Sequence, residues 1–90
     1  MVKNQGQVFK VTRKLETLTP DVNWMILDYM EQKKGKGYYK LMLADQKNYR
    51  AIAIIKEEDY DKYVQSGEIV LLEVRKIKYA RESAKNLSKI

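Results

Sequence analysis

The pattern of hydrophobic and polar positions predicts three consecutive strands in the first two thirds of the chain. Residues 22–29 form a run of large apolar side chains that follows a proline, which favours an extended start. Residues 38–44 form a second run, after a loop rich in lysine and glycine at 33–37. Residues 49–56 form a third run, and the Asp and Asn residues within 45–48 indicate a tight turn before it. Together, the three runs predict an antiparallel meander.

After the meander, the pattern changes to the period of a helix. In residues 57–65, two tyrosines and a valine are spaced three and four positions apart, as on one face of a helix. We interpret the acidic residues at 57–61 as stabilising the first helical turn rather than as a metal site. Gly67 is placed to end this short helix. Residues 68–79 then predict a long final strand, of which 69–72 are all apolar.

The pattern leaves both ends of the chain open. Residues 8–11 fit a strand, but the apolar residues between 8 and 18 also have a near-helical spacing. We therefore treat residues 1–14 as an N-terminal extension of undecided structure. Residues 81–90 fit either a helical turn or a short closing strand.

The order of the predicted elements is typical of one all-β architecture. Three strands, a short helix, a long strand and a weak fifth strand are the order of the OB-fold, a five-stranded β-barrel with a helix between strands three and four. A barrel also suits a chain of 90 residues, which is too short to cover the edges of an open sheet. We expect a single domain over residues 1–90.

Charge adds a candidate partner class. Eighteen Lys and Arg residues against twelve Asp and Glu give a net charge of +6. Basic residues gather at 33–40 and 75–89, whereas acidic residues gather at 57–61. A surface polarised in this way is the electrostatic footprint of a polyanion binder. Two alternatives stay open: these charges belong to solvated surfaces, or they reflect heat adaptation, since a charged fraction of 33% is common in thermophile proteins.

The composition also argues against several classes of protein. The sequence contains neither cysteine nor histidine, so a disulfide framework, a zinc ribbon and the usual general base and thiol nucleophile are missing. We therefore expect a protein that is not an enzyme and needs no metal or other cofactor. No stretch resembles a signal peptide or approaches the ~20 apolar residues of a membrane span. We expect a soluble cytoplasmic protein.

Five stretches of the sequence share their order and spacing with one known family. Residues 15–23 (LETLTPDVN) carry a leucine and a proline ahead of the first predicted strand. Residues 39–45 (YKLMLAD) and 50–54 (RAIAI) fall in the second and third strands. Residues 61–63 (DKY) and 67–70 (GEIV) fall in the helix and at the start of the long strand. Taken together, they resemble the archaeal single-stranded DNA-binding proteins and the OB domains of replication protein A.

The resemblance extends over roughly residues 15–80 and implies an OB-fold that binds single-stranded DNA. Members of the family that grip DNA stack bases on aromatic side chains near the end of the third strand and early in the fourth. Those two positions hold Ile54 and Leu72 in this sequence. Other OB domains of the family dock partner proteins. The resemblance therefore implies, as an alternative, a protein-interaction domain in a DNA replication or repair complex.

The candidate binding surface combines basic side chains with exposed rings, because lysines contact phosphates and rings stack on bases. The lysine-rich loop at 33–37 is expected to close over the ligand, unless it is only a flexible solvated hairpin. Tyr38 and Tyr39 are neighbours in a strand, so one of them faces outward while the other belongs to the core. The ligand is expected to be single-stranded DNA, with RNA as an alternative. The predicted binding residues are Lys33, Lys34, Lys36, Tyr39, Lys40, Arg50, Arg75, Lys76, Lys78 and Tyr79.

Overall fold

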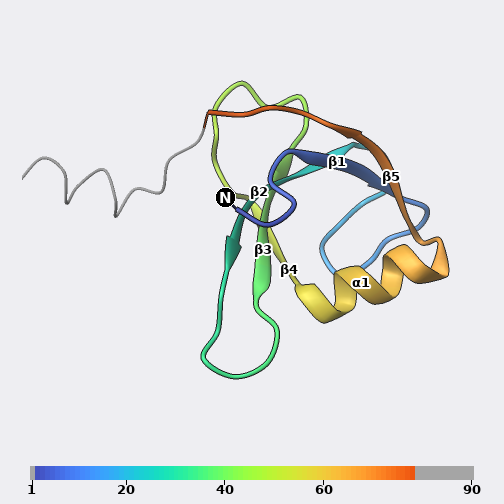
Figure 1. Ribbon diagram of the computed structural model, residues 1–90. Helices are drawn as coiled ribbons and strands as arrows, with labels where there is room; N and C mark the ends of the chain where they lie inside the picture. The colour runs from blue at the N-terminus through green and yellow to red at the C-terminus, as the bar shows by residue number, and fades with distance from the viewer. Residues whose placement is uncertain (1, 79–90) are drawn as a thin grey trace, which may run out of the picture.

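Residues 2–78 are described by a computed structural model, in which one antiparallel sheet carries a single short helix (Figure 1). The strands lie side by side in the order β4-β3-β2-β1-β5. In chain order, the elements are β1 (Gln7–Val11), β2 (Trp24–Met30), β3 (Tyr38–Leu43), β4 (Ala53–Lys56), α1 (Glu57–Ser66) and β5 (Ile69–Val74).

The predicted meander is confirmed by β2, β3 and β4. Neighbouring strands pair antiparallel, with Ile26 opposite Leu41 on β2 and β3, and Leu41 opposite Ala53 on β3 and β4. The β2–β3 hairpin extends beyond the rest of the sheet and carries the lysine-rich loop at its tip (Figure 1). The predicted mostly-β composition with one helix is therefore correct.

The N-terminal residues differ from the expected extension, because Gln7–Val11 is a strand of the sheet. This strand, β1, lies between β2 and β5 and pairs antiparallel with both. The helix consequently follows the fourth strand of the chain instead of the third. The near-helical spacing of apolar residues up to residue 18 does not come from a helix. Leu15 and Leu18 instead lie in a tight turn, in which they exchange two backbone hydrogen bonds of 3.0 and 2.8 Å. Both side chains are buried in the core, which explains their apolar character.

The sheet is open within residues 2–78, because no backbone pairing there joins β4 to β5. The closed barrel expected from the order of elements is thus not seen in this part of the chain. The last strand ends at Val74, earlier than expected. Tyr79 and the expected closing strand at 81–90 lie outside the described residues.

Alternate residues of the strands build a hydrophobic cluster on each face of the sheet. The α1-side cluster contains side chains from every strand, among them Phe9, Ile26, Tyr39, Leu41, Ile55 and Ile69. The cluster on the opposite face is smaller and contains Val8, Met25, Leu27, Met42 and Ala44. Successive residues of β1, β2 and β3 contribute in turn to one cluster and then to the other. The sheet face on which another strand residue lies therefore follows from the residue that it is paired with on the neighbouring strand.

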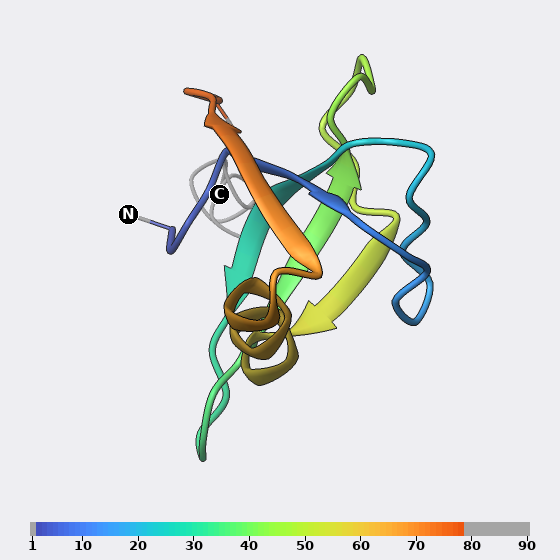
Figure 2. The ribbon, with the colours of Figure 1, turned by 90° about the vertical axis from the view of Figure 1, so that its right-hand side faces the viewer.

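Helix α1 covers the first of these clusters. Its Tyr60 is buried, with the ring centroid 5.7 Å from that of Phe9 and 5.0 Å from that of Tyr39, both near edge-to-face. The helix ends as the sequence predicts, at Gly67 in the left-handed conformation with φ 83°. Figure 2 looks along α1 and shows it beside the ends of β4 and β5. In residues 2–78, the opposite face of the sheet carries no helix.

Candidate nucleic-acid interface

The register of β3 and β4 places a ring, two amines and an aliphatic side chain together on one face. Tyr38 is opposite Lys56, and Lys40 is opposite Ile54. Directly opposed residues of antiparallel strands point to the same side of the sheet. The residues next to them in sequence, such as Tyr39, pack in the α1-side cluster, so these four point away from α1. We call Tyr38, Lys40, Ile54 and Lys56 the β3–β4 face.

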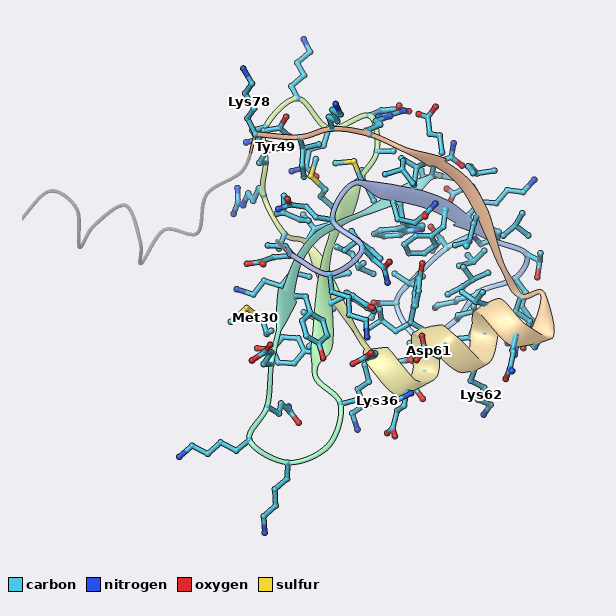
Figure 3. The ribbon with its side chains drawn as sticks, in the orientation of Figure 1. Met30, Lys36, Tyr49, Asp61, Lys62 and Lys78 are labelled. Carbon is cyan, nitrogen blue, oxygen red and sulfur yellow. The ribbon has the colours of Figure 1, made fainter. Side chains whose placement is uncertain are left out.

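Accessibility varies across this face. Ile54 is 59% exposed and Lys56 is exposed, whereas Tyr38 and Lys40 are half-buried. The neighbouring strand β2 adds Met30 opposite Tyr38, and Asp28 opposite Lys40. Figure 3 shows Met30 on the side of the sheet away from α1. The Asp28 carboxylate is buried and accepts a hydrogen bond of 2.8 Å from the backbone N–H of Tyr29. A buried carboxylate thus lies beside Lys40.

The lysine loop, residues 33–37, continues the β3–β4 face at one end. Lys34, Lys36 and Lys56 line one surface hollow, together with Glu58. Lys36 is directed toward α1, where its Nζ lies 3.0 Å from the Asp61 carboxylate (Figure 3). That hydrogen bond raises the pKa of Lys36. Lys33 and Lys34 are exposed, and neither makes a hydrogen bond or ion pair with any residue in 2–78.

Basic residues also flank the other end of the same sheet face. The chain after β5 crosses this end, because Ile77 packs against the cluster on the face opposite α1. Arg75 donates a hydrogen bond of 2.8 Å from its guanidinium to the carbonyl of Ala44, one residue beyond β3. Lys76 and Lys78 are exposed on this segment. Since β3 has six residues, about 20 Å of strand separates this end from the lysine loop.

The structure brings only part of the predicted site to the β3–β4 face: Lys40 lies on it, basic residues flank its two ends, and Lys36 is directed toward α1 instead. Arg50 is exposed in the connection between β3 and β4, before β4 begins, and lies at the end that Arg75 also flanks. Tyr39 was expected to stack on a base, and that expectation is wrong: its side chain is 0% exposed. The ring packs between Tyr29 and Tyr60, and its hydroxyl accepts a hydrogen bond of 2.9 Å from Asn4. Its neighbour Tyr38, and not Tyr39, is the tyrosine that lies on the β3–β4 face.

The two positions at which the family resemblance expects stacking rings are surface positions. Ile54 is 59% exposed and Leu72 is 45% exposed. Both are aliphatic, so they offer apolar contact without a π-face. Ile52, just before β4, is another exposed aliphatic side chain near Ile54, whereas Leu72 lies on β5 at the other edge of the sheet.

Glu57, at the start of α1, is a buried carboxylate, whereas the sequence pattern predicts only that it stabilises the first helical turn. Glu57 is 3% exposed; it accepts a hydrogen bond of 2.6 Å from the Tyr29 hydroxyl and pairs with the Lys3 ammonium. These two partners hold the pKa of Glu57 below its usual value. The sequence carries no signal for this arrangement, because Tyr29 and Lys3 lie 28 and 54 residues away.

No three acidic side chains within residues 2–78 gather into a possible metal site. Helix α1 has ten residues, and no helix in the same part of the chain is long and apolar enough to cross a membrane. Comparison of the chain with known protein families, with curated proteins and with solved structures finds no match.

Proposed function

We propose that this protein is a non-enzymatic binder of single-stranded nucleic acid, foremost single-stranded DNA, and that the ligand lies along the β3–β4 face. The observation that carries the proposal is the pair of cross-strand contacts, Tyr38 with Lys56 and Lys40 with Ile54. In this arrangement the Tyr38 ring and the Ile54 side chain lie diagonally across the two strands. Each of them has a lysine amine directly opposite it on the neighbouring strand. A single strand needs this alternation, because its bases and phosphates must be contacted in turn.

The ends of the face support the same ligand. Phosphates are expected at Lys33 and Lys34 at one end, and at Arg50, Lys76 and Lys78 at the other. About 20 Å between the two ends suits a segment at the short end of the roughly 4–16 nucleotides that single OB-folds cover. We expect little dependence on base sequence, since stacking and phosphate contacts are sequence-tolerant.

We also propose that the sheet is a variant of the OB-fold. The order β2, β3, β4, α1, β5 supports this, as does the antiparallel pairing that joins β5 to the sheet through β1. An OB-fold is a partly open five-stranded barrel, so an open edge in residues 2–78 is compatible with it.

The direct test is titration of a fluorescently labelled oligo-dT strand at about 50 and 200 mM salt, beside a duplex of the same length. We expect micromolar or tighter binding of the single strand, weaker binding of the duplex, and clear loss of affinity at the higher salt. An affinity that is insensitive to salt would refute the proposal, because phosphate contacts release counterions.

A second candidate function is docking of a protein partner, as an adaptor or small subunit of a DNA replication or repair complex. The exposed aliphatic side chains Ile52 and Ile54, two positions apart at β4, favour it, since neighbouring exposed apolar side chains commonly mark interaction sites. Leu72 is also exposed, but it lies on β5 at the other edge of the sheet. Protein docking would take the lead if oligonucleotides bind weakly and a stoichiometric protein partner, retained after nuclease treatment, is lost in an Ile54→Asp variant.

A further inference from the structure

We propose that Tyr29 and Glu57 are positioning residues that hold the lysine loop in place for its ligand. Neither residue belongs to the β3–β4 face. The inference rests on the proposed function, because the lysine loop matters only if its amines meet a ligand.

Three hydrogen bonds form a closed cycle at the point where the lysine loop returns to the sheet. The backbone N–H of Gly37 donates to the Tyr29 hydroxyl at 3.1 Å. That hydroxyl donates its own proton to Glu57 Oε1 at 2.6 Å. The backbone N–H of Glu57 donates to the Gly37 carbonyl at 2.9 Å, which closes the cycle. Both backbone groups of Gly37 are thus fixed, one by β2 and one by the start of α1.

Close packing at Gly37 reinforces this cycle. A Cβ atom at this position would lie 1.9 Å from the Met30 carbonyl oxygen and 3.1 Å from Cζ of the Tyr29 ring. The loop backbone is therefore pressed against β2 at a distance that only glycine permits. The position of the loop relative to β2 follows from this contact and from the hydrogen bonds together.

Burial explains why the cycle persists in the folded state. The Glu57 carboxylate is almost wholly removed from solvent, and a buried charged group that loses a hydrogen-bond donor is costly. Lys3 supplies the second donor from the N-terminal segment. Opening the cycle would leave Glu57 short of a donor and the Gly37 N–H short of an acceptor.

The consequence for binding is preorganisation of the loop amines. Lys34 lines the same hollow as Lys56 of the β3–β4 face, so the direction of the loop decides whether its charge continues that face. A loop that is already held in place loses less conformational freedom when a ligand arrives. Without the Tyr29 hydroxyl, the loop loses one of the contacts that hold it, and more of this ordering must occur during binding.

The test is Tyr29→Phe, with Tyr63→Phe as the matched control. Tyr63 is also half-buried, but lies outside the cycle on α1. We expect Tyr29→Phe to weaken oligo-dT binding by about three- to tenfold, the size of one missing hydrogen bond, and Tyr63→Phe to bind like the parent. We also expect the Lys33→Ala/Lys34→Ala pair to cost less affinity in the Tyr29→Phe background than in the parent. A purely structural role for Tyr29 would leave the lysine effects additive.

Amide exchange at Gly37 separates the possible failures. If the parent does not bind oligo-dT, the proposed function fails, yet faster amide exchange at Gly37 in Tyr29→Phe than in Tyr63→Phe would still support the positioning role. If the parent binds and Tyr29→Phe matches it in affinity and in exchange at Gly37, the positioning role is refuted. Should Tyr29→Phe not fold, Glu57→Ala provides the same readout: it removes the acceptor of the Tyr29 hydroxyl, so amide exchange at Gly37 should become faster than in the parent. Exchange at Gly37 as slow as in the parent would refute the role of the cycle.

Discussion

Lys40 and Ile54 lie directly opposite each other on β3 and β4, on the sheet face that is turned away from α1. The pair combines a cation with an aliphatic side chain where the family resemblance expects a stacking ring. If the ligand crosses this face, the missing ring limits affinity, because each base stacked on an aromatic side chain contributes roughly 1–3 kcal/mol.

The first prediction is a gain of binding. Ile54→Tyr introduces a ring at a 59% exposed position, so the fold should tolerate it, and oligo-dT affinity should rise by about 1–3 kcal/mol. The control is Leu71→Tyr, which adds the same ring at an exposed position opposite Phe9, on the α1 side of the sheet. Equal affinities of the two variants would contradict placement of the ligand on the β3–β4 face.

The second prediction concerns salt dependence. Replacing Lys33 and Lys34 with alanine should lower affinity and reduce the slope of log K against log salt by about 0.7 for each phosphate that is no longer neutralised. Surface substitutions usually change stability by no more than about 0.5 kcal/mol, so melting should be unaffected. The control removes two other exposed lysines, Lys14 and Lys62, and the slope should then stay near that of the parent. A similar drop in both double variants would indicate net charge rather than a located site.

The third prediction separates two neighbouring tyrosines. Tyr38→Ala should cost roughly 1–3 kcal/mol of binding with the salt slope unchanged, as expected for a stacking ring. Tyr39→Ala should instead lower stability by about 3–5 kcal/mol, because it empties a buried position between Tyr29 and Tyr60. A melting curve beside a binding curve for each variant measures both effects. If Tyr38→Ala binds like the parent, its ring does not contact the ligand.

The fourth prediction is a loss of stability in acid that depends on Glu57. Its pKa is lowered in the folded state by hydrogen bonds from Lys3 and Tyr29, and further by the charge of Lys36. Because its pKa is lower in the folded state, the ionised Glu57 carboxylate stabilises the fold at pH values above 4.5, the usual pKa of a glutamate. This stabilisation disappears as the pH falls through the pKa of the folded state. The parent should therefore melt higher than Glu57→Gln at pH 7, and the difference should shrink below about pH 4.5. A difference that does not vary with pH would exclude this charge as the cause.

The fifth prediction concerns alkaline conditions. Burial raises the pKa of Tyr60 to about 12, from its usual value of 10. Because the pKa of the Tyr60 phenol is higher in the folded than in the unfolded state, its contribution to folding stability is fully present below pH 10. This contribution is lost as the pH rises toward 12. Tyr60→Phe should therefore retain its circular dichroism signal to a higher pH than the parent, with Tyr63→Phe on the same helix as control. Tyr39 contributes in the same direction, since burial raises its pKa as well.

The meander and the helix are predictable from the sequence because their signals are local. Apolar runs bounded by turn residues produce β2, β3 and β4, and Gly67 ends α1 at the expected place. The inward or outward direction of Tyr38 and Tyr39 is not predictable in this way. Because side chains alternate between the two faces of a strand, one of the two rings must face outward, but the sequence is compatible with either one. The pairing register of β3 with β2, which places Tyr39 opposite Tyr29, decides which ring is buried.

The other features that the sequence does not predict depend on residues that are distant along the chain. The strand at Gln7–Val11 is held by pairing with β5, so its own residues carry no unambiguous signal. The hydrogen bonds of Glu57 join the N-terminal segment, β2 and α1, and a first-turn acid looks the same in sequence with or without such partners. In both cases tertiary contacts decide a feature for which the local pattern allows two answers.

The position of β1 between β2 and β5 has a consequence for synthesis on the ribosome. Of the described elements, β1 is synthesised first and needs a neighbour from the last one, since Phe9 is opposite Leu71 and Val11 is opposite Ile69. Closing so long a loop is entropically costly, and topologies with such distant contacts fold slowly. Until residue 74 has left the exit tunnel, β1 has no β5 to pair with, and the nascent chain exposes its apolar side chains to chaperones and proteases.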